Sequence, residues 1–89
     1  MAKTGLSNQL LGKRIVPKPE YGSVSERDPI KITQNVHLWS GLQPDGAGDY
    51  HAYIDAAWVD SDGNVKIAVH DSFGATKEMW LTHVNLDQR

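Results

Sequence analysis

The stretch "YIDAAWVDSDGNVKIAVHD", residues 53–71, decides the fold of this chain. Apolar and polar residues alternate on either side of Asp62-Gly63, as they do along half-buried strands. Asp-Gly is a favoured pair for a two-residue type I′ hairpin turn. The register that this turn sets would gather an apolar core face, which consists of Ile54, Ala56, Trp58, Ile67 and Val69.

The same register makes specific predictions about pairs of residues across the hairpin. It places Trp58 opposite Ile67 on the core face. On the outer face it places Asp55 opposite His70, and a carboxylate in that position would favour the charged imidazole. An exposed ion pair of this kind contributes well under about 1 kcal/mol, so its presence alone does not indicate a functional site.

Asp60, Asp62 and Asn64 could also be read as a calcium-binding loop, since their oxygens alternate. An EF-hand loop has its glycine after the third ligand, whereas Gly63 comes before Asn64. The twelfth position of the loop would be Asp71 rather than glutamate. We therefore interpret these residues as turn formers, and we predict neither a metal nor a cofactor.

Further strand-like segments surround the hairpin. We predict an all-β fold, a small five-stranded antiparallel barrel with strands at about 11–16, 30–39, 50–60, 65–71 and 78–85. The Pro-containing segment 17–29 and the Gly-rich segment 41–49 read as loops. Residues 1–10 are expected to form a flexible N-terminus, and residues 11–89 a single domain, because 89 residues suit one small domain.

Composition narrows the function classes. The chain has no Cys, which excludes a disulfide framework or a thiolate zinc site. No apolar run is long enough to span a bilayer, and the first residues make a poor signal peptide. We expect a cytoplasmic protein with no membrane partner. Residues 1–31 carry a net charge of +3, whereas the remainder carries −5, so the folded body is acidic.

The leading functional interpretation is a non-enzymatic module that binds an unidentified protein. It would act as an adaptor or inhibitor, of the kind that bacteria, phages or mobile elements encode. Strand alternation predicts an exposed aromatic and histidine patch on neighbouring strands, and such patches bind proteins. The patch consists of His37, Trp39, His51, Tyr53, Asp55 and His70. The alternative reading of Trp39 is that it covers the open end of the barrel.

The runner-up interpretation is a nucleic-acid-binding barrel. Trp39 or Tyr53 would stack on bases, and a basic N-terminal arm would hold phosphates. The cationic side chains of that arm are Lys13, Arg14, Lys18, Arg27 and Lys31. Steep salt dependence of binding would be the signature of this function.

No catalytic site is predicted from the sequence. "HDS" at residues 70–72 contains the letters of a catalytic triad, but a triad is a spatial arrangement. Neighbouring strand residues point to opposite faces, so His70 and Asp71 cannot serve one site. A third interpretation, an enzyme, would require a homo-oligomer with a site at its symmetry axis.

The segments "LLGKRIV", "YIDAAWVDSDGNVKIAVHD" and "EMWLTHVNL" follow one another in a layout that resembles the SH3-like small barrels. Within that superfold the C-terminal part is similar in layout to the plasmid-borne type II dihydrofolate reductases. Their pore motif V-Q-I-Y-P is absent, and "EMWLTHV" stands in its place. The resemblance therefore implies a fold and a frequent use of that fold in binding, and it implies no activity or site residue.

Overall fold

The computed structural model describes residues 9–24 and 33–87. Several sequence-based predictions lie outside these residues, namely most of the flexible N-terminus, the first part of the strand at 30–39, Arg27 and Lys31.

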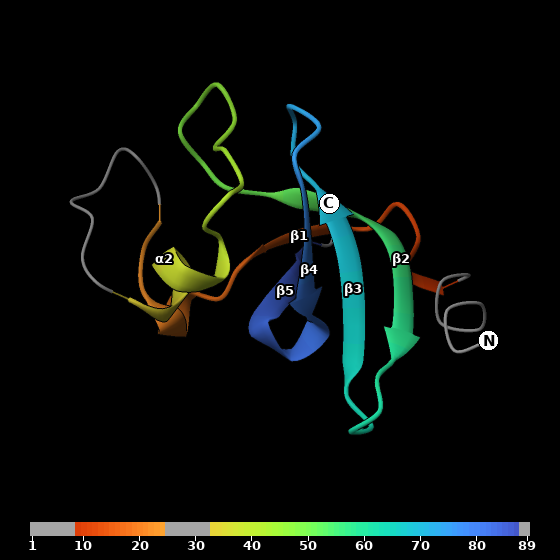
Figure 1. Ribbon diagram of the computed structural model, residues 1–89. Coiled ribbons are helices and arrows are strands. Elements are labelled where there is room, and N and C mark those ends of the chain that lie inside the picture. Colours follow the sequence, from red (N-terminus) through yellow and green to blue (C-terminus); the bar gives the residue numbers. More distant parts are fainter. Residues whose placement is uncertain (1–8, 25–32, 88–89) are drawn as a thin grey trace.

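One antiparallel sheet of five strands dominates the described residues, in the order β4-β3-β2-β1-β5 (Figure 1). This confirms the predicted all-β class. The strands are β1 (Arg14–Pro17), β2 (Ala52–Val59), β3 (Val65–His70), β4 (Thr76–Trp80) and β5 (Val84–Asp87). The short helices are α2 (Gln34–Leu38) and the 3₁₀ turns η1 (Pro19–Tyr21) and η2 (Leu81–His83). None of the described helices has the length and apolar character needed to cross a bilayer.

The hairpin between β2 and β3 forms where predicted, but its turn and register differ. The Asp60 N–H donates to Asn64 O at 2.8 Å, and Gly63 N–H donates to Asp60 O at 3.1 Å. Three residues therefore close the turn, and Gly63 takes a φ of 85°, which glycine adopts without strain. As a result Lys66, not Ile67, lies opposite Trp58.

A bulge at Asp55 shifts the register again, between the Ile54–Val69 and Ala56–Ala68 pairs. Because of this extra residue, Ile54 stays in the core as predicted, and Ala57 replaces Ala56 there. The prediction that Trp58 and Ala56 belong to the core face was wrong. Both are half-buried and alternate with the buried Ala57, on the outer face of the sheet.

The predicted strand at 30–39 was wrong over its described part, which contains helix α2. Thr33 caps the helix by accepting a hydrogen bond from Val36 N–H at 3.3 Å. Asn35 is fully buried, and its side-chain amide donates to Lys18 O at 2.8 Å and to Gly22 O. These bonds hold α2 against η1 on one side of the sheet (Figure 1). Distant partners thus override the alternating pattern of this segment.

The predicted strand at 78–85 is divided. η2 interrupts it, so β4 pairs with β3 while β5 pairs with β1. The chain therefore crosses from one edge of the sheet to the other, and residues on η2 can face the ends of both β3 and β5.

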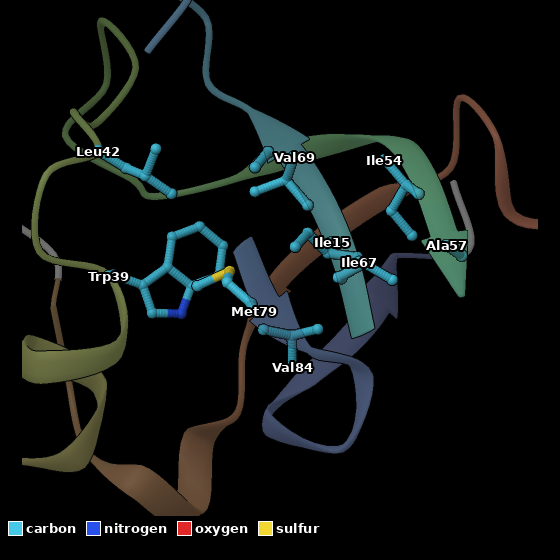
Figure 2. Close-up of a cluster of buried hydrophobic side chains, with 10 residues drawn as sticks. Ile15, Trp39, Leu42, Ile54, Ala57, Ile67, Val69, Met79 and Val84 are labelled. Atoms are coloured by element: carbon cyan, nitrogen blue, oxygen red, sulfur yellow. The ribbon is translucent and has the colours of Figure 1, made fainter. Parts of the chain in front are cut away.

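Trp39 packs in the core with only 1% of its surface exposed, so its predicted place in an exposed patch was wrong. It follows α2 directly, and Figure 2 shows its ring beside Leu42 and Met79. Its ring therefore packs between the segment that follows α2 and the sheet. The buried cluster comprises Ile15, Trp39, Leu42, Ala52, Ile54, Ala57, Ile67, Val69, Met79 and Val84.

Candidate functional site

The predicted aromatic and histidine patch divides between different parts of the molecule. Four of its members come together around β2 and β3, where Tyr53 lies between the two imidazoles of His51 and His70. The ring centroids are 5.4 Å apart for His51–Tyr53 and 5.6 Å for Tyr53–His70. The fourth member, Asp55, contacts His70. His37 lies elsewhere, on α2, and Trp39 is in the core.

The predicted contact between Asp55 and His70 is confirmed, although its structural basis differs. The His70 Nδ1 atom lies 2.8 Å from Asp55 Oδ1. Tyr53, rather than Asp55, is the direct cross-strand neighbour of His70, and the bulge turns Asp55 toward the ring. Both side chains are exposed to solvent, at 40% and 49%.

His51 occupies a different environment, since only 6% of it is exposed. Its Nε2 atom lies 3.0 Å from Ser72 Oγ, and its Nδ1 atom lies 3.3 Å from Asp45 Oδ2. The second contact is an ion pair, and His51 Nδ1 makes no hydrogen bond in this structure. Asp45, His51 and Ser72 thus form a serine–histidine–aspartate cluster. Sequence reasoning missed it, because its members come from three separate segments.

Asp45 is held in place by its own loop. Its Oδ1 atom accepts hydrogen bonds from Ala47 N–H at 2.9 Å and Asp49 N–H at 3.0 Å, which leaves Oδ2 toward His51. The bond from Asp49 lowers the pKa of Asp45. Burial acts against it, and the bond from Ala47 and the nearby His51 and Arg14 add to the lowering. Asp45 is therefore ionised at neutral pH.

Ser72 is held by Asp71, which is 1% exposed. The Oδ1 atom of Asp71 accepts from Phe73 N–H at 2.8 Å and Ala75 N–H at 2.9 Å, so it closes the turn that carries Ser72. Its Oδ2 atom accepts from Gln43 N–H at 2.8 Å, which ties this turn to the loop of Asp45. Burial acts to raise the pKa of Asp71, but the backbone hydrogen bonds outweigh it, and the pKa lies below its ordinary value.

A second surface lies at the opposite ends of the strands. Trp58, Lys66 and Trp80 are direct cross-strand neighbours on β2, β3 and β4, and all three are half-buried. They share the outer face of the sheet, because they alternate with the core residues Ala57, Ile67 and Met79. The two indole side chains therefore flank one lysine.

The 3₁₀ turns extend this row. The His83 ring stacks on Trp80 with centroids 5.6 Å apart and an angle of 17° between the rings. Tyr21 meets His83 edge-on at 6.3 Å, and Lys18 Nζ lies 5.7 Å from the centre of the Tyr21 ring. We call this continuous set the aromatic band, which consists of Trp58, Lys66, Trp80, His83, Tyr21 and Lys18.

A cleft of about 270 Å³ opens beside Trp80 and His83. Leu38 and Met79 contribute apolar walls, and His37 lies at its border, so this member of the predicted patch belongs to the aromatic band side of the molecule. Lys77 also lines the cleft, and its Nζ donates to Ser40 O at 2.7 Å, which anchors the end of α2. Burial lowers the pKa of Lys77.

Positive charge predominates around the aromatic band and this cleft. Lys18, Lys66 and Lys77 lie in or beside it. The acidic neighbour in the cleft, Glu78, is 3.8 Å from Lys66 and partly balances it. Glu20, next to Tyr21 on η1, balances a second charge, so this surface keeps a small excess of positive charge on a chain whose net charge is −2.

Two basic residues of the predicted nucleic-acid arm adjoin Tyr53. Lys13, Arg14 and Tyr53 line a cavity of about 550 Å³ together with Leu10, Leu86 and Asp87. Arg14 lies directly opposite both Tyr53 and Asp87 across the sheet, and its Nε is 3.0 Å from Asp87 Oδ2. Its charge is thus shared with a carboxylate. Lys18 belongs to the aromatic band instead.

Within residues 9–24 and 33–87, no group of three or more His, Asp or Glu side chains is arranged to hold a metal ion. Comparisons with protein-family models, with curated proteins and with solved structures found no match to this chain.

Proposed function

We propose that this chain is a small protein-binding module, an adaptor or inhibitor, and that the aromatic band is its contact surface. The observation that carries the proposal is the continuous row from Trp58 to Lys18 across β2, β3, β4 and both 3₁₀ turns. Aromatic side chains dominate the binding energy of protein interfaces, because they bury a large area with few rotatable bonds. The aromatic band contains two tryptophan side chains and one tyrosine side chain.

The band also indicates the chemistry of the partner. A cleft of about 270 Å³ beside Trp80 has Leu38 and Met79 among its walls, which suits one apolar side chain. Lys66 and Lys77, which line the cleft, and Lys18, at the end of the band beside Tyr21, suit carboxylates. We therefore expect the partner to present an acidic segment that carries an apolar anchor residue.

The overall layout supports a binding role. Five short strands, a long connection between β1 and β2 and a tight hairpin favour an SH3-like barrel, a superfold that often serves in binding. Fold analogy gives only a prior, so the weight of the proposal rests on the band.

The test is selection of peptides from a displayed random library, followed by affinity measurement by calorimetry. We expect the selected peptides to be acidic with an aliphatic or aromatic anchor. Trp80→Ala should weaken their binding by about 30-fold or more, as expected for a hot-spot residue. The control is Phe73→Ala, which removes an aromatic ring that is 64% exposed and lies outside the band.

Charge reversal supplies a second pair of variants. Lys66→Glu lies within the band and should weaken binding of an acidic peptide, whereas Lys13→Glu lies outside it and should not. If Trp80→Ala and Lys66→Glu bind the selected peptides as tightly as the unmodified chain, then the aromatic band is not the contact surface.

A second candidate function has its own observation, the cavity lined by Lys13, Arg14 and Tyr53. A tyrosine ring beside two cations could stack on a base while the cations contact phosphate. Binding to a thymidine oligonucleotide should then fall steeply with salt and be lost in Tyr53→Ala. Binding that stays constant between low and high salt would exclude this function.

A further inference from the structure

The serine–histidine–aspartate cluster has the connectivity of a nucleophilic relay. Ser72 Oγ lies 3.0 Å from His51 Nε2, and Asp45 Oδ2 faces the other ring nitrogen at 3.3 Å. If the proton of the neutral ring is on Nδ1, toward the carboxylate, then Nε2 is free to accept the hydroxyl proton. In this structure His51 Nδ1 makes no hydrogen bond, so its contact with Asp45 would have to align when substrate binds, as hydrogen bonds of catalytic groups often do.

The cluster is preorganised by the two loops that carry it. Asp45 keeps Oδ2 toward His51, because Oδ1 is engaged by two backbone N–H groups. The turn of Ser72 is closed by Asp71 in the same manner, and the Gln43 N–H bond to Asp71 joins both loops. His51 is buried between them, whereas Ser72 is exposed and can meet a substrate from solvent. Fixed positions of this kind are what proximity effects in catalysis require.

We propose that Ser72 is an activated nucleophile that accepts acyl groups from small activated esters, with His51 as general base and Asp45 as the group that positions His51. This departs from the sequence-based expectation of no catalytic site. It is independent of the proposed binding function, because no residue of the aromatic band takes part.

The chemistry balances as follows. Ser72 Oγ attacks the ester carbonyl carbon, and its proton passes to His51 Nε2. The bond between the carbonyl carbon and the leaving oxygen breaks, and the leaving group takes the proton from His51. Water then attacks the acyl-serine with His51 again accepting the proton, which releases the carboxylic acid and restores the Ser72 hydroxyl.

The first test uses a fluorophosphonate probe, which forms a P–O bond to an activated serine and releases fluoride. We expect the intact chain to be labelled at one site, and peptide mass spectrometry should place the label on Ser72. This readout does not depend on the folding of any variant. Absence of labelling under conditions that label a serine esterase standard, or a label at a residue other than Ser72, would overturn the proposal.

The second test measures the rate of p-nitrophenyl acetate hydrolysis. Ser72→Ala and His51→Gln should each lower the part of the rate that exceeds hydrolysis by the exposed imidazoles by about 100-fold or more, the range of a lost general base or nucleophile. Ser72→Ala keeps all four histidines, so hydrolysis by exposed imidazoles remains as the background. Circular dichroism of each variant checks the fold.

His70→Gln is the matched control. His70 also has an aspartate, Asp55, at 2.8 Å from Nδ1, but it lies outside the cluster. The His70→Gln variant should hydrolyse p-nitrophenyl acetate at the same rate as the unmodified chain. Equal rates for Ser72→Ala and the unmodified chain would show that the cluster only ties two loops together, and would overturn the proposal.

Discussion

Two histidine–aspartate pairs lie on either side of Tyr53. They differ in contact distance, in burial and in their further partners. The exposed pair, His70 and Asp55, has the shorter contact, at 2.8 Å against 3.3 Å for His51 and Asp45. The buried pair, however, has side chains only 6% and 25% exposed, against 40% and 49%. His51 also has a second polar partner, Ser72.

The difference shows that a short distance does not identify the important pair. Solvent screens the exposed pair, and holding its side chains in place costs conformational entropy, so a contact at 2.8 Å adds little. His51 itself is shielded from water, and backbone N–H groups fix the carboxylate of Asp45, so we expect less screening and a smaller entropy cost for this pair. Supporting bonds and burial therefore distinguish the two pairs.

The largest effect should come from the carboxylate that supports the buried pair. Asp71→Ala leaves the N–H groups of Gln43, Phe73 and Ala75 without their acceptor, and Asp71 itself is buried. We expect the free energy of unfolding, measured with urea, to fall by about 3 kcal/mol, since three part-buried hydrogen bonds to a fully buried carboxylate are lost and each unmet donor costs about 1–3 kcal/mol.

Asp60→Ala is the control for this prediction. Asp60 also closes a turn, with Oδ1 accepting from Asp62 and Asn64 N–H groups at 3.0 and 2.9 Å. Water can replace these bonds at the exposed hairpin, so the loss should be about 1 kcal/mol. Equal losses of unfolding free energy in the two variants would mean that the burial of Asp71 does not make its turn more important for stability.

The sequence predicted the hairpin and most of its core, because alternation over residues 53–71 is a local signal. It did not predict the register. That depends on a three-residue turn at Gly63 and on a bulge at Asp55, and neither changes the alternating pattern enough to be recognised. Helix α2 was missed since Asn35 is fixed by Lys18 and Gly22, both distant in sequence.

The candidate site was predictable only in part, for the same reason. The Asp55–His70 contact lies within one hairpin, and its prediction is confirmed. His51 and Ser72 are 21 positions apart, and no spacing rule links them. The aromatic band forms because η2 interrupts the predicted strand and brings His83 onto Trp80. The alternating pattern of residues 78–85 gave no sign of this interruption.

The second prediction compares the two imidazoles directly. His51→Ala removes a buried ring with its contacts to Tyr53 and Ser72, and should lower the free energy of unfolding by about 2 kcal/mol. His70→Ala removes an exposed ring, and should change it by no more than about 0.5 kcal/mol. Thermal unfolding of both variants in one buffer measures the contrast. A larger loss for His70→Ala would reverse the comparison.

The third prediction concerns acid. The pKa values of Asp71 and Asp45 lie below their ordinary values, so both stabilise the fold while they are ionised. That contribution is complete above the unfolded-state pKa, about 4 for aspartate, and is lost as pH falls through the folded-state pKa. We expect the free energy of unfolding to decrease below about pH 4, and to decrease less steeply in Asp71→Asn. An unchanged slope in Asp71→Asn would contradict this assignment.

The smallest expected effect is the coupling within the exposed pair, which a double-mutant cycle of Asp55→Ala and His70→Ala isolates. At neutral pH and low salt the coupling should be about 0.5 kcal/mol or less, because both groups are solvated. It should disappear at about 1 M salt, where screening acts over about 3 Å. A coupling above about 1.5 kcal/mol that persists in salt would mean that the Tyr53 ring shields this pair from water. The exposed pair would then be a second rigid element of the surface, and the contrast between the two histidines would rest on Ser72 alone.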